Sequence, residues 1–363
     1  MTEHRAGAVL EVDLGAIVVN WQFLRTKHAA GPVAGVVKAD AYGLGAGQVA
    51  PALLDAGCRH FFVALPEEAF GLRNRLPGAM LAVLNGLFPG TAPDYAAHEI
   101  VPVLGSLSEI EEWSAMARRL DRKLPALLHI DTGMARLGLT AAEVSAIAEA
   151  PDRLAGIDLL YVMTHLVSSE VPEERLNQEQ RRRFDAACAM LPKAPRSLAN
   201  SSGIFLGGDF GSDLARPGAA LYGINPTPGR SNPMQQPVRL RARVLDVREI
   251  GPGDSVGYNA TWRASRRSRI ATAAIGYADG WHRSHSNRGQ AIFDGRPVPL
   301  VGRVSMDLAT FDVTEHPGVR PGEWLDLLGP GQTPDDVALS AGTNGYEVLT
   351  SLGHRFHRVY CRA

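Results

Sequence analysis

The sequence predicts an α/β protein in which an N-terminal (β/α)8 barrel of the TIM type, residues 1–230, precedes a mostly β domain, residues 231–363. In the first part, eight short apolar runs recur every 20–40 residues, and helical patterns separate most of them, which is typical of a closed parallel barrel. A stretch rich in proline and glycine, 226–233, then marks a linker. Beyond it, short β segments alternate with Pro-Gly turns, which indicates a second, β-rich domain.

Asp13 can cap the first helix, since apolar residues from Leu14 to Leu24 recur at helical spacing on one face. Barrel strands are then expected at 33–38, 60–65, 79–84, 100–104, 125–130, 157–164, 196–200 and 213–222. Helices are expected at 66–76, 107–120, 141–149 and 173–190, and strands of the second domain at 238–250, 268–276, 290–293, 297–301, 306–313 and 323–328. An open, doubly wound sheet is the alternative, and the closed barrel is preferred because no Gly-x-Gly-x-x-Gly follows the first strand.

Composition and charge argue against several classes of function. A formal net charge of -1 gives no electrostatic reason to bind nucleic acid or an anionic membrane. The three cysteines are far apart and odd in number, which predicts neither a disulfide framework nor a zinc site. The H-x-x-H pairs that begin at His282 and His354 lack acidic or cysteine ligands at metal spacing, so no metal is expected. Without a signal peptide or an apolar run of about 18 residues, a cytoplasmic location is expected.

Lys38 is the residue that points most directly to chemistry. It lies where the apolar stretch from Val33 to Val37 gives way to a Gly-rich loop, so its amine is expected to be partly desolvated. Desolvation lowers the pKa of an amine and frees it to form a Schiff base with a carbonyl. The ordinary alternative is a lysine at a strand end whose ammonium group reaches solvent.

Other polar residues follow the predicted strands at the end where barrel enzymes carry their active sites. They are Tyr42 after the first strand, Arg136 after the fifth, His165 after the sixth, Asn200 and Ser201 after the seventh, and Arg216 and Gly218 near the eighth. Small residues let backbone N–H groups approach a phosphate, and a serine hydroxyl adds a donor. Each residue alone has an ordinary explanation as a helix cap, a half-buried histidine or an ion-pair arginine. Together they favour a site for a phosphorylated carbonyl cofactor.

Ordered motifs along the whole chain resemble those of the alanine racemases. The first is the lysine motif Val37-Lys38-Ala39-Asp40-Ala41-Tyr42-Gly43. The others span His129 to Gly138, Ala199 to Ser202, Arg216 to Gly218, Gly257 to Trp262, Gly276 to Gly280, Gly302 to Asp307 and Tyr346 to Val348. The resemblance implies a barrel that holds pyridoxal 5'-phosphate, a C-terminal β domain, and a head-to-tail homodimer with shared active sites.

The resemblance also implies a mechanism with two bases, one on each face of the substrate carbon. Lys38 holds the cofactor at rest and then serves as one base, and Tyr258 of the partner subunit serves as the other. A tyrosine hydroxyl is ordinarily protonated at neutral pH and needs help to act as a base. The family supplies that help through a histidine matching His165, which is linked in turn to Arg216. Arg216 faces the pyridine nitrogen and, being a donor only, leaves that nitrogen unprotonated.

The remaining contacts follow from the same resemblance. The cofactor-binding residues are Lys38, Tyr42, His165, Asn200, Ser201, Arg216, Gly218 and Tyr222. Arg136 and the Met306 backbone hold the substrate carboxylate. The entrance is lined by Tyr277, Arg283, Arg303, Asp307 and His354. The activity implied is the interconversion of L- and D-alanine, which supplies D-alanine for peptidoglycan.

Three residues depart from the pattern of the family. His129 replaces a lysine that is carbamylated in many members and orients the arginine matching Arg136, so something else must hold Arg136. His354 stands where many members have a tyrosine of the inner gate, which bears on the size of side chain admitted. Asn259 replaces a commoner glycine directly after Tyr258.

Three other functions are alternatives to this one. A racemase of serine, or one of broader specificity, would share the catalytic residues and differ only at the gate. A non-catalytic pyridoxal-phosphate-binding protein resembles the barrel alone, whereas this chain has a second domain with Tyr258. A decarboxylase of similar plan would have a cysteine near the active site of the β domain, and Cys361, at the end of the chain, is poorly placed for that role.

Overall fold

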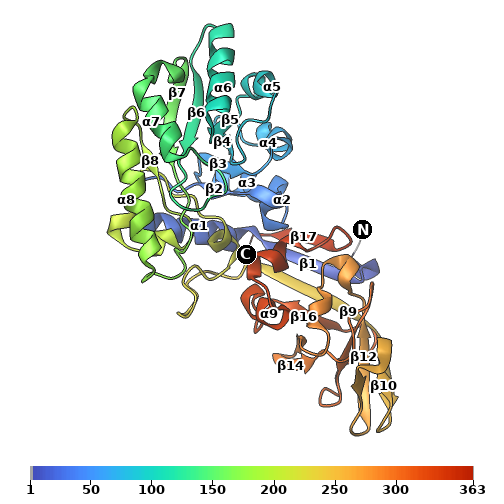
Figure 1. Cartoon of the computed structure of the whole chain (residues 1–363). Coiled ribbons are helices and arrows are strands. Elements are labelled where there is room, and N and C mark those ends of the chain that lie inside the picture. Colours follow the sequence, from blue (N-terminus) through green and yellow to red (C-terminus); the bar gives the residue numbers. More distant parts are fainter. Residues whose placement is uncertain (1–2, 363) are drawn as a thin grey trace.

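The computed structural model describes residues 3–362, which form two lobes that meet along the middle of the molecule (Figure 1). Seven short parallel strands, paired in chain order, form the core of the first lobe. They are β2 (Gly35–Val36), β3 (His60–Val63), β4 (Met80–Val83), β5 (Val101–Leu104), β6 (Leu124–His129), β7 (Ile157–Met163) and β8 (Arg196–Ser197). The inward side chains of these strands pack together in the barrel interior, among them Val36, Phe62, Val103 and Met163.

The predicted eighth strand, 213–222, is wrong over most of its length. Only Ala215 forms a β-bridge, with Val33, and residues Ala219–Tyr222 form a 3-10 turn, η5. Backbone hydrogen bonds still join this segment to the first strand, through Ala34 N–H and Ala215 O (2.8 Å), and to the segment after β8, through Arg216 N–H and Ala199 O (2.8 Å). The barrel is therefore closed, as predicted, by one bridge in place of a full strand.

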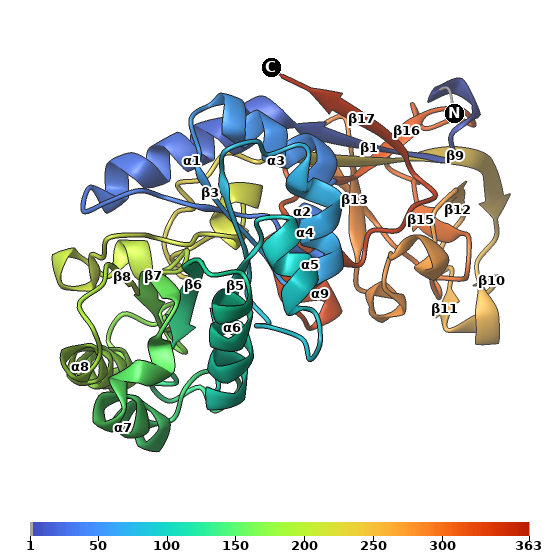
Figure 2. The ribbon, with the colours of Figure 1, turned by 90° about the horizontal axis from the view of Figure 1, so that it is seen from above.

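Helices lie around the outside of the barrel strands (Figure 2). They are α1 (Leu14–His28), α2 (Lys38–Tyr42), α3 (Ala46–Asp55), α4 (Pro66–Arg73), α5 (Ala92–Ala97), α6 (Leu107–Arg119), α7 (Ala141–Glu149) and α8 (Arg175–Met190). The predicted cap of α1 is confirmed, since Asp13 Oδ1 accepts the N–H of Ala16 (3.1 Å). Among residues 3–362, none of the helices combines the length and the apolar composition that a membrane span requires.

The second lobe is a mostly antiparallel sheet with two short helices. Its strands are β1 (Ala8–Asp13), β9 (Val238–Ile250), β10 (Ser255–Val256), β11 (Trp262–Arg263), β12 (Ser268–Ala273), β13 (Gln290–Phe293), β14 (Arg296–Pro299), β15 (Ala309–Asp312), β16 (Trp324–Leu328) and β17 (His357–Cys361). The helices are α9 (Pro334–Ala341) and α10 (Gly345–Thr350). The main path of the sheet runs β14-β13-β16-β9-β1-β17, with β12 also paired to β9 and β15 paired to β12.

Strand β1 lies in this second sheet, although the sequence prediction grouped the first residues with the barrel. It pairs antiparallel with β9 and parallel with β17. Val9, Leu10 and Val12 are fully buried between its neighbours and the adjoining core. The chain thus starts in the second lobe, crosses to the barrel at Asp13, and returns at β9.

Candidate active site

Lys38 opens a left-handed turn at the end of β2. The four residues after it, 39–42, all have φ between 53° and 56°. This conformation costs roughly 1–2 kcal/mol for each residue that has a Cβ. Glu68 offsets part of that cost, because its Oε1 accepts the N–H of Ala39 (2.5 Å) and of Asp40 (3.4 Å). A carboxylate from α4 therefore holds the loop that presents the lysine.

The amine of Lys38 is half-buried on the rim of the barrel. Burial lowers its pKa, the positive charge of Arg136 lowers it further, and the negative charge of Glu68 raises it. The net direction is downward, as expected from the apolar strand that precedes the lysine. A larger fraction of this amine is unprotonated near neutral pH than for a lysine in water.

A small concave site lies beside this turn. It is formed by Tyr42, Ser201 and the backbone of residues 218–220, and is called the cradle below. Ser201 Oγ accepts the N–H of Gly218 (3.1 Å) and of Ala220 (3.2 Å). A Cβ at Gly218 would lie 2.2 Å from the hydroxyl oxygen of Tyr42, so only glycine fits between them. Backbone N–H groups and two side-chain hydroxyls therefore converge here, which is the donor set that a phosphate group requires.

The neighbours of the cradle fix its shape. The Tyr42 and Tyr222 rings pack with their centroids 4.7 Å apart, and the Tyr222 hydroxyl donates to Val36 O (3.0 Å). Asn200 Oδ1 accepts from the N–H of Gly203 (2.8 Å), and the Ser169 hydroxyl lies 2.8 Å from the same oxygen. Asn200 thus shapes the loop after β8, and Tyr222 links the cradle to the strand before Lys38.

Arg216 is a buried cation without a buried counter-charge. Its side chain donates from Nη1 to Ser197 Oγ (2.5 Å) and from Nη2 to Thr164 O (2.5 Å). Within residues 3–362 no carboxylate forms an ion pair with it. Burial lowers the pKa of its guanidinium to about 10, so the group is still charged near neutral pH. It can therefore offer a hydrogen bond to a neutral acceptor, such as a ring nitrogen, but it cannot provide a proton.

His165 is neutral in this environment. Burial lowers its pKa to about 3, and the positive charges of Arg216 and Arg136 act in the same direction. Within the described part of the chain, no hydrogen bond joins the side chains of His165 and Arg216, and the charge of Arg216 acts on His165 only by disfavouring protonation of its ring. A neutral imidazole can still accept a hydrogen bond from a tyrosine hydroxyl.

Many family members have a negatively charged carbamylated lysine at the position of His129, and His129 cannot supply that charge. It is buried beside a cavity of about 280 Å³ that Arg136 also lines. Burial, together with the charge of Arg216, lowers its pKa to about 4, which makes it neutral near pH 7. Asp131 holds the neighbouring loop instead, since its carboxylate accepts the N–H groups of residues 133–135. Arg136 is thus placed through its backbone, while its side chain is exposed.

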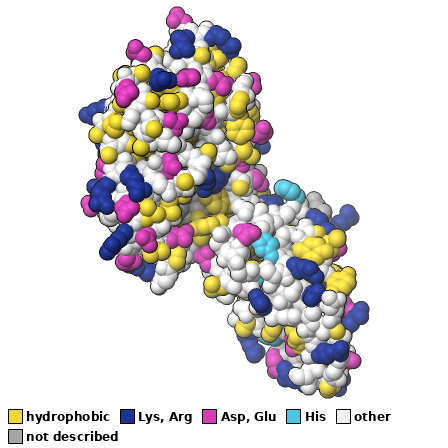
Figure 3. Space-filling view, in the orientation of Figure 1, with side chains coloured by type: hydrophobic (Ala, Val, Ile, Leu, Met, Phe, Trp, Pro, Cys, Tyr) yellow, Lys and Arg dark blue, Asp and Glu magenta, His cyan; other side chains and the backbone are white. Residues whose placement is uncertain are grey.

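The β-domain residues of the predicted site lie apart from Lys38. Tyr258 begins a short 3-10 turn between β10 and β11, at the end of the second lobe that is farther from the barrel (Figure 1). Its side chain is 68% exposed, and those of Met306 and Tyr277 are 55% and 44% exposed. Figure 3 shows hydrophobic side chains on this lobe and in the hollow where the two lobes meet. One chain alone therefore does not bring the tyrosine to the lysine.

The residues predicted to line the entrance lie in the same lobe as Tyr258. Arg283 and His354 are exposed, and Arg303 is half-buried. Asp307 forms an ion pair with Arg355 (2.8 Å). These residues, like Tyr258, face outward from the chain that carries them.

Tyr346 is a residue that the sequence analysis did not assign to the site. It belongs to α10, which packs so closely on α2 that a Cβ at Gly43 would lie 2.4 Å from Leu349 O. Its hydroxyl donates to Glu170 Oε1 (2.5 Å), and burial, then this carboxylate and the nearby Tyr42, raise its pKa. Tyr346 therefore lies beside Tyr42 at the barrel mouth. The sequence did point to this residue, because Tyr346 is the first residue of the motif Tyr346 to Val348.

A sizeable cavity lies elsewhere in the described chain. It measures about 770 Å³ and lies among Trp21, Arg59 and His60, at the end of the barrel where the strands begin. Parallel barrels carry their chemistry at the other end, where the strands finish and where Lys38, Ser201 and Arg216 are found. We therefore assign the site to the latter rim.

This fold and rim define a class of protein: a barrel enzyme that holds a phosphorylated aldehyde cofactor on a lysine. Comparison with known proteins narrows the class. The models of the alanine racemase N-terminal domain and C-terminal domain match residues 12–226 and 237–360. The chain belongs to the alanine racemase family.

The similarity to known proteins extends over almost the full length of this chain. An alanine racemase of Acidiphilium cryptum is 54% identical over 96% of this chain and 98% of its own. A catabolic alanine racemase of Mesorhizobium japonicum is 47% identical over 99% of this chain and 95% of its own. The crystal structure of alanine racemase from Bartonella henselae, with covalently bound pyridoxal phosphate, is 41% identical and superimposes with a TM-score of 0.95 over 98% of this chain and 100% of that one.

Proposed function

We propose that the protein interconverts L- and D-alanine, with pyridoxal 5'-phosphate as its cofactor and Lys38 as the residue that holds it. The observation that carries this proposal is the joint placement of a desolvated lysine, a hydroxyl- and amide-lined cradle and a buried, unpaired arginine on one barrel rim. The sequence similarity to alanine racemases over the full length supports the choice of substrate.

Residues of one chain are sufficient to hold the cofactor. Tyr42, Ser201 and the Gly218 amide would bind its phosphate, and Arg216 would face its ring nitrogen. Once bound, the cofactor supplies an electron-withdrawing ring that makes the Cα–H of an amino acid acidic enough for a side-chain base. Its ring nitrogen would receive a hydrogen bond from Arg216 and no proton, since the guanidinium does not release one.

Two side chains then handle the proton. Lys38 would remove or return the Cα proton on one face, and Tyr258 of a second subunit would do so on the other. The neutral ring of His165 would accept a hydrogen bond from the Tyr258 hydroxyl and orient it. The depressed pKa of His165 supports this role, because a protonated imidazole has no free acceptor.

The substrate carboxylate would lie between the two subunits. Arg136, held by its loop on one barrel, would meet the backbone of Met306 from the other chain. Tyr277, Arg283, Arg303 and Asp307 would line the approach to the site. Tyr346, from the chain that carries Lys38, would limit the space for the substrate side chain.

A homodimer with two shared sites follows from this arrangement. The exposure of Tyr258, Tyr277 and Met306 supports it, because large apolar side chains on one face are typical of a surface that a partner covers. Supply of D-alanine for peptidoglycan is the role we propose in the cell. The cytoplasmic location stays a prediction.

Chiral chromatography of L-alanine and L-serine incubated with the purified, cofactor-loaded protein tests the activity. D-Alanine is expected to form much faster than D-serine. Comparable rates would support a racemase of broader specificity, and the absence of both D-products would contradict the proposal.

Mixing two inactive variants tests the shared site. Lys38→Ala and Tyr258→Phe dimers, exchanged to equilibrium, form heterodimers in which one of the two sites has both residues intact. About one quarter of the original activity is expected after random exchange, since half the dimers are mixed and each has one intact site. If both residues of a site came from one chain, no activity would return.

A further inference from the structure

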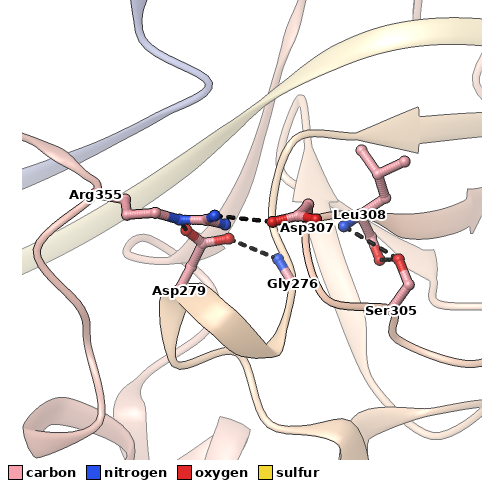
Figure 4. A network of polar contacts seen from close by, with 6 residues as sticks. All are labelled: Gly276, Asp279, Ser305, Asp307, Leu308 and Arg355. Atoms are coloured by element: carbon pink, nitrogen blue, oxygen red, sulfur yellow. Dashed lines mark hydrogen bonds and ion pairs between the residues drawn. The ribbon is translucent and has the colours of Figure 1, made fainter.

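Arg355 joins two acidic residues that come from different loops (Figure 4). Its Nε donates to Asp279 Oδ1 (2.6 Å) and its Nη1 donates to Asp307 Oδ1 (2.8 Å). The other oxygen of Asp279 accepts the backbone N–H of Gly276 (2.9 Å). The Asp279 side chain is 7% exposed, whereas that of Asp307 is 56% exposed. The guanidinium therefore links a buried, well-bonded carboxylate to one that faces outward.

Backbone contacts place the Met306 segment but do not fix the carboxylate of Asp307. The N–H of Ala278 donates to Met306 O (2.9 Å). A Cβ at Gly276 would lie 2.3 Å from the same oxygen, so the two loops are in close contact and need glycine there. Within the described residues, Arg355 is the one hydrogen-bond partner of the Asp307 carboxylate.

The segment that carries Arg355 is itself anchored from the barrel side. Arg358 donates to Gly43 O (2.7 Å), at the end of α2, and to Gly353 O (3.2 Å). The N–H of Gly353 donates to Asp279 O (3.0 Å). The backbone around Arg355 is thus anchored, and the bond to Asp279 holds its guanidinium. The guanidinium can therefore hold the Asp307 carboxylate in place.

The charge of Asp307 matters because of its neighbour. Asp307 directly follows Met306, whose backbone the proposed function assigns to the substrate carboxylate. Two carboxylates at close range repel each other, and the repulsion grows where a second subunit excludes water. A guanidinium bonded to Asp307 removes this repulsion and, because it is also bonded to Asp279, keeps the Asp307 side chain in one orientation.

We propose that Arg355 sets the affinity of the partner's active site for the substrate carboxylate, by neutralising Asp307 and fixing the Met306 segment. This inference rests on the proposed function. Arg355 acts through Asp307 and touches no reacting atom, so it is a positioning residue.

Binding of propionate, which has the carboxylate of alanine without its amine, tests the inference without turnover. In the cofactor-loaded protein, Arg355→Met is expected to raise the Kd of propionate and the KM of L-alanine about tenfold each, with kcat changed by less than about threefold. Adding Asp307→Asn to Arg355→Met is expected to recover most of both losses, because the uncompensated charge is then gone. Titration calorimetry and initial rates give the two constants.

Equal losses in Arg355→Met and in the double variant would overturn the inference. Asp307→Asn alone retains the arginine and keeps the test available if Arg355→Met does not fold. It is expected to bind propionate at least as tightly as the unaltered protein, and weaker binding would also overturn the inference. Arg266→Met, which removes an exposed ion pair with Glu315 (2.6 Å) in the same domain, is the matched control. If the unaltered protein binds propionate but does not racemise alanine, the proposed function fails while the binding data still test Arg355.

Discussion

The barrel rim and the outward face of the β domain differ in how far one chain completes them. On the rim, Arg216 is 4% exposed and Ser201 is 9% exposed, and the polar atoms of both have protein partners. On the β domain, Tyr258 is 68% exposed. In the proposed function, the cofactor site is therefore formed within one chain, whereas the second base and the Met306 contact come from a second subunit. Changes at the rim should therefore affect cofactor binding and catalysis together, and changes at the β-domain face should affect substrate binding or catalysis and leave cofactor binding unchanged.

The largest effect is expected for Lys38→Ala. It removes both the covalent anchor and one base, so racemisation should fall by at least about 10⁴-fold, a loss typical of removing a covalent catalytic group. The absorption band of the covalently held cofactor should disappear as well. Lys27→Ala, on the exposed end of α1, is the matched control. A variant at Lys38 with a tenth of the original rate would contradict the assignment.

Tyr258→Phe should separate the effect of the β-domain face from that of the barrel rim. It removes one base without touching the rim, so the rate should fall about 10²- to 10⁴-fold while cofactor loading is unchanged. In heavy water, one enantiomer of alanine should still exchange its α-hydrogen through Lys38, and the other should not. Tyr161→Phe, near the opposite end of the barrel, controls for loss of a hydroxyl. Exchange lost equally from both enantiomers would argue against a two-base site.

Gly218→Ala tests whether cofactor binding at the rim depends on the shape of the cradle. The added Cβ would lie 2.2 Å from the Tyr42 hydroxyl oxygen, so the cradle must shift to admit it. Overpacking of this kind costs about 1–3 kcal/mol, which corresponds to a loss of cofactor affinity between about 5- and 150-fold. Fluorescence titration of the apoprotein measures it. Gly208→Ala, where nothing lies within 4 Å of the new atom, is expected to leave the affinity unchanged.

The smallest effect concerns stability at acid pH. Burial and the nearby arginines lower the pKa of His129 to about 4, so the folded protein keeps this ring neutral where the unfolded chain, below about pH 6.5, takes up a proton. The contribution to stability is complete above about pH 6.5 and declines as the pH falls towards 4. His129→Gln should therefore reduce the slope of stability against pH in this window by up to about 1.4 kcal/mol per unit. Urea unfolding at several pH values measures it, with the exposed His98→Gln as control; identical slopes would refute the prediction.

Much of the fold could be predicted where local chemistry decides the structure. Helix α7, strand β9 and the Asp13 cap were predicted from periodicity and a capping residue, and α7 and β9 have the predicted bounds. The prediction of a strand at 213–222 was wrong, because an apolar run containing Pro217 and Gly218 has the composition of a strand while its backbone turns to form the cradle. Strand β1 was missed because its partners, β9 and β17, lie more than 200 residues away in the chain.

The site was predicted less completely than the fold. Residue types and order indicated the rim residues, but no sequence pattern predicts four consecutive left-handed residues made of Ala, Asp, Ala and Tyr. That turn depends on Glu68, a contact made only in the folded barrel. Likewise, the place of Tyr346 beside Tyr42 depends on how α10 packs against α2, which the spacing of residues along the chain does not reveal.

Strand β1 also has a consequence for synthesis. As the ribosome makes the chain, residues 8–13 are made before the barrel strands, yet their first hydrogen-bonding partner, β9, begins only at Val238. At about 5–20 residues per second, this apolar segment waits for roughly ten seconds or longer before it can pair. The barrel can be complete in that time, since all its strands are made before β9. The sheet of the second domain cannot be, because it also contains β17, which is made after every other strand of the described residues.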